Sequence, residues 1–362
     1  MTTATIGAPA ERAYPSYAHP WWRRTLLTRE FAIIALLVVV FCWATFEVAN
    51  FNSPLTIYFL GLDNAEIMLI ALPMALVIIT GEIDLSVASV VGLSSVMVGI
   101  LHQDVGLTIP VAGLIAILVG AVAGVLNGFL VAYVGLPSLA VTIGTMALYR
   151  GLAVGLLGTT AKTDFPEKWT NLAQDHIGNS RFPLIVVPIL VLVVVFVWLL
   201  HFSPFGRGVY EIGLNDEAAR FSGVNVERTK LILFTLTAAI SAFAGIYITL
   251  RTGNARGDNA TGDELKVIAA VLLGGVSIFG GRGRLHGVIA GVLLIGVIQS
   301  AMRLENETVN VINIVIGVLL VLSVMATALL AWLPRVRSSR FRMLGLSRRR
   351  THVATSTRTT ER

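Results

Sequence analysis

Charged side chains are scarce in this sequence. Only 13% of its 362 residues are Asp, Glu, Lys or Arg, about half the share of an ordinary soluble domain, and 55% are hydrophobic. This composition excludes a typical soluble globular enzyme. It also excludes an intrinsically disordered chain, because such chains combine low hydrophobicity with high charge. The composition is that of a protein that crosses a membrane several times.

Cysteine is nearly absent as well. Cys42 is the only one, so no disulfide can form within the chain. It lies inside an apolar run, and we expect its side chain to be a small buried hydrophobic group.

Motifs that bind nucleotides or metals are missing. The sequence has no G-x-x-x-x-G-K-[ST] phosphate loop, and the glycine-rich run 274–284 lacks the Lys-Ser/Thr pair. The six histidines are scattered, and no H-E-x-x-H pair completes a metal site. No nucleophile and base stand at a recognisable spacing. We therefore expect no enzyme activity and no cofactor or metal. Any uphill transport must draw on an ion gradient or on another subunit.

Basic residues concentrate in the two tails. Residues 1–30 and 334–362 carry 13 of the 27 Lys and Arg. Arg clusters beside apolar runs are typical of the cytoplasmic ends of membrane helices, whereas nucleic-acid binding needs a basic stripe on a folded surface. We therefore expect a lipid bilayer as a partner and no nucleic acid.

Long apolar runs predict an all-α, polytopic membrane helical bundle of about ten transmembrane helices. The predicted spans are 31–50, 64–80, 85–101, 107–133, 138–158, 183–202, 231–251, 264–281, 285–303 and 309–333. The first is longer than the core of a signal peptide and is predicted to be retained. The third is polar on one side and the eighth is short with a Gly-Gly end, so a broken or re-entrant segment is an alternative for both.

An even number of crossings places both termini on one side of the membrane. Lys and Arg are most frequent in the tails and in the loop 203–230, so the positive-inside rule predicts that both termini are cytoplasmic and that 159–182 lies outside. The predicted organisation is a cytoplasmic N-terminal tail (1–30), a transmembrane domain (31–333) and a basic cytoplasmic C-terminal tail (334–362).

Glycines recur at a spacing of four in three of the predicted spans. The three sets are Gly120, Gly124 and Gly128; Gly151 and Gly155; and Gly287 and Gly291. Small residues at this spacing let helix backbones approach closely. We expect each set to pack against another helix of the same chain, with a pore or dimer contact as the alternative.

The loop 203–230 is the only long loop on the side of the termini. It contains an N-cap residue, two acids suited to a first turn, helix-forming residues and a terminating glycine, which predict a short surface helix. These residues are Asn215, Asp216, Glu217, Ala218, Ala219, Arg220 and Gly223. Residues 215–224 resemble the coupling loop of permeases in ATP-binding-cassette (ABC) importers. The resemblance implies that this helix docks into an ATPase subunit, and a solvated connector is the alternative.

Three further stretches resemble one branch of that family. Residues 81–89 (Gly-Glu-Ile-Asp-Leu-Ser-Val-Ala-Ser) resemble its G-G-I-D-L-S-V-G-S signature. Residues 135–151 resemble its P-x-x-x-V-T-L-G-x-x-x-x-Y-R-G run, and residues 264–283 its E-L-x-x-I-A-A…G-G…G-G-x-G run. In this order they resemble the monosaccharide permeases of the ribose, xylose, rhamnose and autoinducer-2 type, within the branched-chain-amino-acid/sugar permease family.

This resemblance implies the permease subunit of an ATP-driven importer in the bacterial plasma (inner) membrane, with a path for a neutral rhamnose-like or ribose-like sugar or autoinducer-2. It implies ABC ATPase subunits that bind the ATP, an extracytoplasmic sugar-binding protein, and a second permease copy or paralogue. A branched-chain amino-acid permease is one alternative, which the I-D-L-S-V run disfavours. An ion-coupled secondary transporter is another, which the loop 203–230 disfavours.

Seven polar residues in or beside the apolar spans are candidates for the substrate path: Asp84, Ser86, Asn127, Thr142, Arg150, Gln299 and Asn313. Asp84 either caps the third span, which we favour, or is a functional intramembrane acid. Arg150 either snorkels from a helix end or anchors a neighbouring carbonyl or carboxylate. The uncharged groups each suit interhelical hydrogen bonds, and as a set they suit the hydroxyls of a sugar.

Two charged residues depart from these motifs. Glu82 stands in place of a glycine, and Lys266 stands where an Asp or a small residue is common. A contact between the two is one interpretation. The other, which we favour, is that Lys266 snorkels to the outer interface.

Overall fold

The computed structural model describes residues 29–158, 160–178, 180–322 and 325, and helices dominate them. The labelled helices are α2 (Arg29–Glu47), α3 (Pro54–Ile79), α4 (Val87–Gln103), α5 (Ile109–Ala132), α6 (Ser138–Leu157), α7 (Glu167–Gln174), α8 (Val186–Phe202), α9 (Pro204–Leu214), α10 (Asp216–Phe221), α11 (Val226–Thr252), α12 (Asp263–Leu273) and α13 (Leu285–Leu304). An apolar helix, Val309–Leu322, follows α13. Within these ranges the β contacts are two isolated bridges, so the predicted all-α fold is confirmed.

Among the described residues, six helices are long and apolar enough to cross a membrane. They are the stretch Glu30–Glu47 of α2 together with α3, α5, α6, α11 and α13. α8 and α9, which are bent by 67° on either side of Ser203, form a seventh candidate when they are counted as one span. The predicted polytopic membrane bundle is therefore confirmed.

Two of the predicted crossings are only partly helical. α12 has 11 residues, so it is about 16 Å long and too short for the roughly 30 Å of hydrocarbon. It continues as an irregular stretch, residues 274–284, which we call the α12–α13 segment. α4 has 17 residues and follows another irregular stretch, residues 80–86, which we call the α3–α4 segment. These are the third and eighth predicted spans, for which the sequence offered a broken segment as the alternative.

The count of ten complete crossings stays a prediction. α4, α12 and Val309–Leu322 supplement the seven candidates, but the last predicted span, 309–333, is described only as far as 322 and at residue 325. The predicted tails lie almost wholly outside the described residues.

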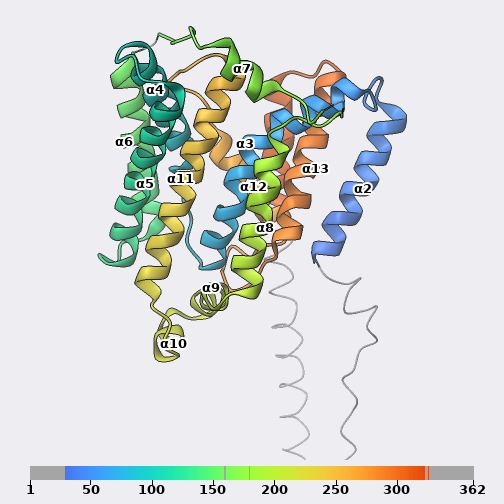
Figure 1. Ribbon diagram of the computed structural model, residues 1–362. Helices are drawn as coiled ribbons and strands as arrows, with labels where there is room; N and C mark the ends of the chain where they lie inside the picture. The colour runs from blue at the N-terminus through green and yellow to red at the C-terminus, as the bar shows by residue number, and fades with distance from the viewer. Residues whose placement is uncertain (1–28, 159, 179, 323–324, 326–362) are drawn as a thin grey trace, which may run out of the picture.

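α3 and α11 occupy the middle of the bundle. Most of α3 is buried, and α11 packs against α3, α4 and α5, while α13 packs against α2, α3 and α12. Figure 1 shows α7 lying across one end of the bundle and α9 with α10 at the opposite end, which we call the α7 end and the α10 end. Both the α3–α4 segment and the start of α11 belong to the α10 end (Figure 1).

Two of the three glycine sets pack within the chain as predicted. A Cβ on Gly124 would lie 2.5 Å from the Phe234 carbonyl oxygen of α11, and one on Gly291 would collide with the Ala270 carbonyl oxygen of α12. The prediction is wrong for the third set. A Cβ on Gly151 or Gly155 would meet no atom of the described chain within 4 Å, so this face of α6 is left open.

Cys42 is exposed on α2, and the prediction that it is buried is wrong. The apolar run around it is a candidate span of which little is buried inside the described chain. Exposed apolar side chains are expected on such a span, because lipid rather than protein surrounds a membrane bundle.

Candidate functional site

The α3–α4 segment is held by the first turn of α6. The amide of Ile83 donates a hydrogen bond of 3.2 Å to Ser138 Oγ, and Thr142 Oγ1 donates one of 3.2 Å to the Ile83 carbonyl oxygen. Thr142 also donates to the Ser138 carbonyl oxygen one turn earlier. An irregular segment inside a bundle must find partners for its backbone groups, and α6 supplies both for Ile83.

Asp84 is fully buried in this segment. Its Oδ1 accepts hydrogen bonds from the Ser86 amide at 2.9 Å and from Ser86 Oγ at 2.6 Å. Its Oδ2 is buried without a hydrogen-bond partner among the described residues. α4 begins at Val87, and Ser86 just before it makes no side-chain cap hydrogen bond. Asp84 accepts the amide two residues further on, as a capping side chain does, and stabilises the turn that precedes α4, so its role as a cap stays a prediction.

The hydrogen-bond chain continues into α5 and α6. Asn127 Nδ2 donates to Ser86 Oγ at 2.8 Å, and the Tyr149 hydroxyl donates to the Ala123 carbonyl oxygen at 2.9 Å and to Asn127 Oδ1 at 3.3 Å. Because Ser86 accepts from Asn127 while it donates to Asp84, one buried polar network links α4, α5 and α6.

Four of the seven predicted path residues thus come together around the α3–α4 segment: Asp84, Ser86, Asn127 and Thr142. Ser138 and Tyr149 belong to the same cluster, but the sequence reasoning did not single them out. Ser138 and Thr142 stand four residues apart at the start of an apolar span, and this spacing is the signal that could have identified Ser138.

Arg150 anchors backbone carbonyl groups, which is one of its two predicted roles. Its Nη1 donates to the carbonyl oxygens of Gly257 at 2.6 Å and Asn259 at 2.9 Å, and its Nη2 donates to that of Ala88 at 3.0 Å. Arg150 therefore ties α6 to the first turn of α4 and to the loop that leads into α12, so it connects the two broken crossings.

The loop before α12 also carries an exposed ion pair. Arg256 Nε and Nη2 each donate to a carboxylate oxygen of Asp258 at 2.7 Å. These hydrogen bonds lower the pKa of the Asp258 carboxyl below its usual value, because they favour its charged form.

Gln299 and Asn313 lie apart from the cluster around Asp84. Gln299 is buried in α13, and Asn313 is exposed beside a cavity of about 240 Å³ that Lys266 also lines. The structure therefore does not unite all seven predicted residues at one place.

Neither departure from the motifs contacts the other. Lys266 Nζ pairs with Asp263 Oδ1 of its own helix at 2.7 Å, whereas Glu82 Oε1 accepts from Lys230 Nζ of α11, also at 2.7 Å. The interpretation that Glu82 contacts Lys266 is wrong. The actual partner, Lys230, is 148 residues away, and no local pattern predicts such a pair.

The predicted surface helix is present as α10. Asn215 is its N-cap, and the Ala218 amide donates to Asn215 Oδ1 at 2.9 Å. Asp216 and Glu217 lie in the first turn, and Gly223, with a φ of +88°, ends the element. These are the bounds that capping rules predict.

α9 contacts the α12–α13 segment and the end of α3. The Tyr210 hydroxyl donates to the Gly283 carbonyl oxygen at 2.7 Å. At Gly213 a Cβ would collide with the Ile79 carbonyl oxygen and the Gly281 amide nitrogen, so only glycine permits this approach. The amide of Gly281 donates to the same Ile79 oxygen at 2.8 Å. The end of α3, the α12–α13 segment and α9 therefore meet at one point.

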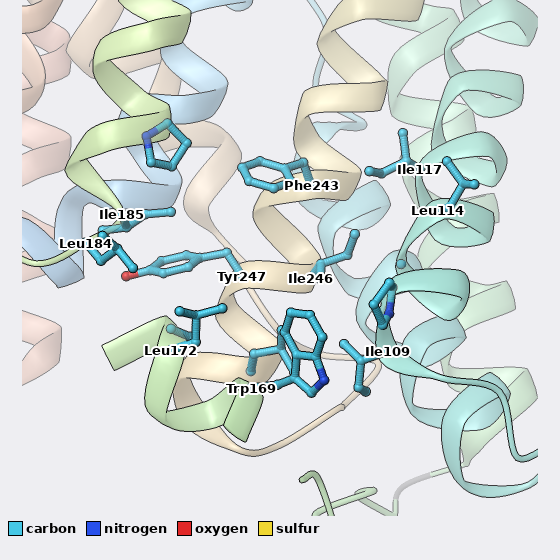
Figure 2. Close-up of a pocket in the computed structure, with 15 residues that line it drawn as sticks. Ile109, Leu114, Ile117, Trp169, Leu172, Leu184, Ile185, Phe243, Ile246 and Tyr247 are labelled. Atoms are coloured by element: carbon cyan, nitrogen blue, oxygen red, sulfur yellow. The ribbon is translucent and has the colours of Figure 1, made fainter. Parts of the chain in front are cut away.

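An apolar cavity of about 500 Å³ lies between α5, α7, α8 and α11, near the α7 end (Figure 2). Trp169 and Leu172 of α7 face Ile246 and Tyr247 of α11 across it (Figure 2). None of the seven predicted path residues lines this cavity. A sugar needs hydrogen-bonding partners for its hydroxyls, so this lining does not suit one.

Comparisons with known proteins match most of this chain, including the residues of the site. The family model described as the permease component of the branched-chain amino acid transport system matches residues 60–324. The autoinducer 2 import system permease protein LsrD of Photorhabdus luminescens is 32% identical over 328 residues, which cover 86% of this chain and 96% of the relative. LsrD of Yersinia pseudotuberculosis is 32% identical over 335 residues, which cover 89% of this chain and 98% of the relative. No solved structure matches this chain.

The matched region includes both irregular segments, α6 and the α9–α10 connection, and so contains the four stretches that carried the resemblance in the sequence. The relatives are transport permeases rather than enzymes. The resemblance is confirmed, and the chain belongs to the family of permease components of branched-chain amino acid transport systems.

Proposed function

We propose that this chain is the transmembrane permease subunit of an ATP-driven importer that takes up a neutral sugar-like solute of the autoinducer-2 type. The single observation that supports it most directly is the buried polar cluster around the α3–α4 segment, in a chain related over most of its length to LsrD permeases. ABC ATPase subunits would bind the ATP, and an extracytoplasmic binding protein would deliver the solute.

The charges of the site favour a neutral solute over an amino acid. A zwitterion needs a fixed cation for its carboxylate, and such a charge is costly at membrane depth. Arg150 directly follows Tyr149 of the cluster in the sequence, but its two terminal nitrogens are hydrogen-bonded to three backbone carbonyl oxygens. Ser86, Asn127 and Thr142 offer uncharged groups instead. The branched-chain amino acids, which the family description names, are the second candidate.

The α10 end supports coupling to an ATPase. α10 is a short, well-capped helix at the end of the bundle, and Phe221 on it is 93% exposed. Through Tyr210 and Gly213 of α9, this end reaches the α12–α13 segment and the last residue of α3, directly before the α3–α4 segment. Movement of α10 by an ATPase would therefore reach the two places where the helical spans are interrupted. In this proposal the α10 end and both termini are cytoplasmic, in the inner membrane of a bacterium.

The open face of α6 supports a second permease. A Cβ added at Gly144, Gly151 or Gly155 would meet no atom of the described residues within 4 Å, and Leu148 and Leu152 on the same helix are about half exposed. The opposite side of α6 holds Thr142 and Arg150 of the site. A second copy or a paralogue packed on this face would enclose the path between two polypeptides, with α6 beside it.

Uptake measurements test the assignment. The permease is reconstituted in vesicles with its ATPase and binding protein, and uptake of labelled autoinducer 2, rhamnose, ribose and leucine is compared with and without ATP. We expect ATP-dependent uptake of a sugar-like solute. Preference for leucine would show that the chain is an amino-acid permease instead. Uptake driven by an ion gradient without ATP would contradict the proposed ATP-driven importer.

A further inference from the structure

One lysine joins the coupling end to the irregular α3–α4 segment. Lys230, in the first turns of α11, donates from Nζ to Glu82 Oε1 at 2.7 Å and to Asp216 Oδ2 at 2.6 Å. Glu82 is two residues before Asp84, and Asp216 is the first residue of α10. The lysine thus holds one acid from each of the two elements at the same time.

The bridge is shielded from water on the side of the lysine. The Lys230 side chain is 9% exposed and that of Glu82 is 16% exposed, whereas that of Asp216 is 42% exposed. Removing one partner of a buried pair is costly because it leaves a charge without compensation. Glu82 and Lys230 are therefore held together more firmly than exposed ions, while the Asp216 contact lies closer to solvent.

A cavity of about 310 Å³ lies beside the bridge. Its lining includes Glu82, Asp216, Arg220 and Lys230 together with the loop before α6. This space gives the carboxylate of Asp216 room to move relative to α11. The bridge therefore connects α10, α11 and the α3–α4 segment beside a cavity and is not part of a close-packed core.

The contacts form a continuous path from α10 through Lys230 to the α3–α4 segment. Asp216 is part of α10, and Lys230 is in the second turn of α11. Glu82 precedes Ile83, whose amide and carbonyl groups are both hydrogen-bonded to side chains of α6. A displacement of α10 either carries Glu82 with it through Lys230 or breaks one of two short charged contacts. The first outcome displaces the backbone beside the buried carboxylate of Asp84.

We propose that Lys230 is a positioning residue that couples α10 to the α3–α4 segment, so that the movement imposed on α10 changes the site around Asp84. The inference rests on the proposed function, because it requires an ATPase to act on α10. Glu82 replaces the glycine of the motif that this stretch resembles, so the bridge is a property of this chain rather than of the motif.

The test measures solute transported per ATP hydrolysed by the reconstituted complex. Lys230→Met is expected to lower this ratio about fivefold or more, within the range of ordinary coupling free energies, while ATP hydrolysis continues. Lys230→Arg keeps both acids paired and is expected to retain most of the ratio. Glu82→Gly removes the acid and restores the residue of the motif, so it provides a mild second variant if Lys230→Met fails to insert.

A double variant separates coupling from simple loss of structure. Glu82→Gly combined with Lys230→Met is expected to lower the ratio no further than the stronger single variant, because both remove one link. Lys162→Met, which breaks the pair with Asp104, is the matched control and is expected to leave the ratio unchanged.

Two results would overturn the inference. One is an unchanged ratio in both Lys230→Met and Glu82→Gly. The other is a parallel fall of transport and ATP hydrolysis, since this would show that the lysine only maintains the fold. The ratio is measured with whichever solute the wild-type complex takes up, so an error in the proposed sugar leaves the test intact. Absence of ATP-dependent uptake by the wild-type complex would refute the proposed function, and this inference with it.

Discussion

Asn127 and Ser86 are 41 residues apart and are joined by a buried hydrogen bond of 2.8 Å from Asn127 Nδ2 to Ser86 Oγ. This bond orients the Ser86 hydroxyl, which then donates to Asp84 at 2.6 Å. The side-chain amide of Asn127 on α5 therefore orients the hydroxyl group that donates a hydrogen bond to the Asp84 carboxylate. The polar cluster is consequently expected to respond to changes on α5 that never touch Asp84.

The first prediction concerns Asn127. Asn127→Leu removes the donor to Ser86 and the acceptor of the Tyr149 hydroxyl, so we expect the free energy of unfolding to fall by about 1–3 kcal/mol. Uptake should slow, whereas the preferred solute should stay the same if a separate binding protein selects it. Thermal unfolding in detergent and vesicle uptake are the measurements. Asn127→Gln is the control for side-chain polarity, and a changed solute preference in either variant would contradict the prediction.

The second prediction ranks two neighbouring acids. Asp84→Ala deprives the Ser86 amide and hydroxyl of a buried charged acceptor, and we expect a loss of about 1.5–3 kcal/mol in unfolding free energy. Glu82→Ala leaves Lys230 paired with Asp216, so no charge is left without a partner and we expect a smaller loss than for Asp84→Ala. Melting temperatures of the purified variants give the ranking. Equal melting temperatures would refute it, and Asp84→Asn, which keeps an acceptor for Ser86, should lie between wild type and Asp84→Ala.

The third prediction concerns the end of α10. Gly223 has a φ of +88°, which proline cannot adopt, so Gly223→Pro should distort the exit from α10. We expect the variant to insert normally but to transport less solute for each ATP hydrolysed. Gly106, with a φ of +80° in the loop between α4 and α5, allows the matched variant Gly106→Pro. The same loss of coupling in both variants would show that the effect is not specific to α10.

Part of this site could be predicted from the sequence because its signals are local. Asn215 and Gly223 define α10 through caps that act within a few residues, and Gly124 and Gly291 predict close helix approach without knowledge of the partner. The pairing of Glu82 with Lys230 could not be predicted. It depends on how α11 packs beside the α3–α4 segment, and neither charge carries information about a partner so distant in the chain.

The errors have the same origin. Cys42 and Gly151 both lie in apolar helices, where a sequence pattern does not distinguish a face turned to protein from one turned to lipid or to another subunit. The third predicted span was expected to begin at residue 85, but α4 begins at Val87, after the turn that Asp84 and Ser86 form. In each case the missing information was tertiary packing rather than residue preference.

The fourth prediction concerns topology. If both termini are cytoplasmic, a reporter that is active only outside the cytoplasm should be inactive when it is fused after Arg362. The same reporter inserted in the loop that contains Lys162 should be active, because this loop lies at the α7 end, opposite α10. A reporter that fluoresces only in the cytoplasm should give the reverse pattern. Activity of the first reporter at Arg362 would contradict the predicted orientation.

The last prediction tests the second permease on α6. Because Cys42 is the only cysteine, Cys42→Ser gives a background in which one new cysteine reports one contact. Gly151→Cys places a thiol on the open face of α6, and we expect oxidation in native membranes to yield a covalent dimer when the partner is a second copy. Symmetry supports this expectation, since a twofold interface brings equivalent positions of two copies close together.

The control for that experiment is a cysteine on an exposed apolar position elsewhere. Leu118 on α5 is 57% exposed, so Leu118→Cys measures random collisions between copies in the membrane. Equal dimer yields at the two positions would contradict an interface on α6. A paralogous partner would instead give a cross-link between Gly151→Cys and a cysteine on that paralogue, with no covalent homodimer. The pattern of products therefore distinguishes a homodimer, a heterodimer and the absence of any contact on this face.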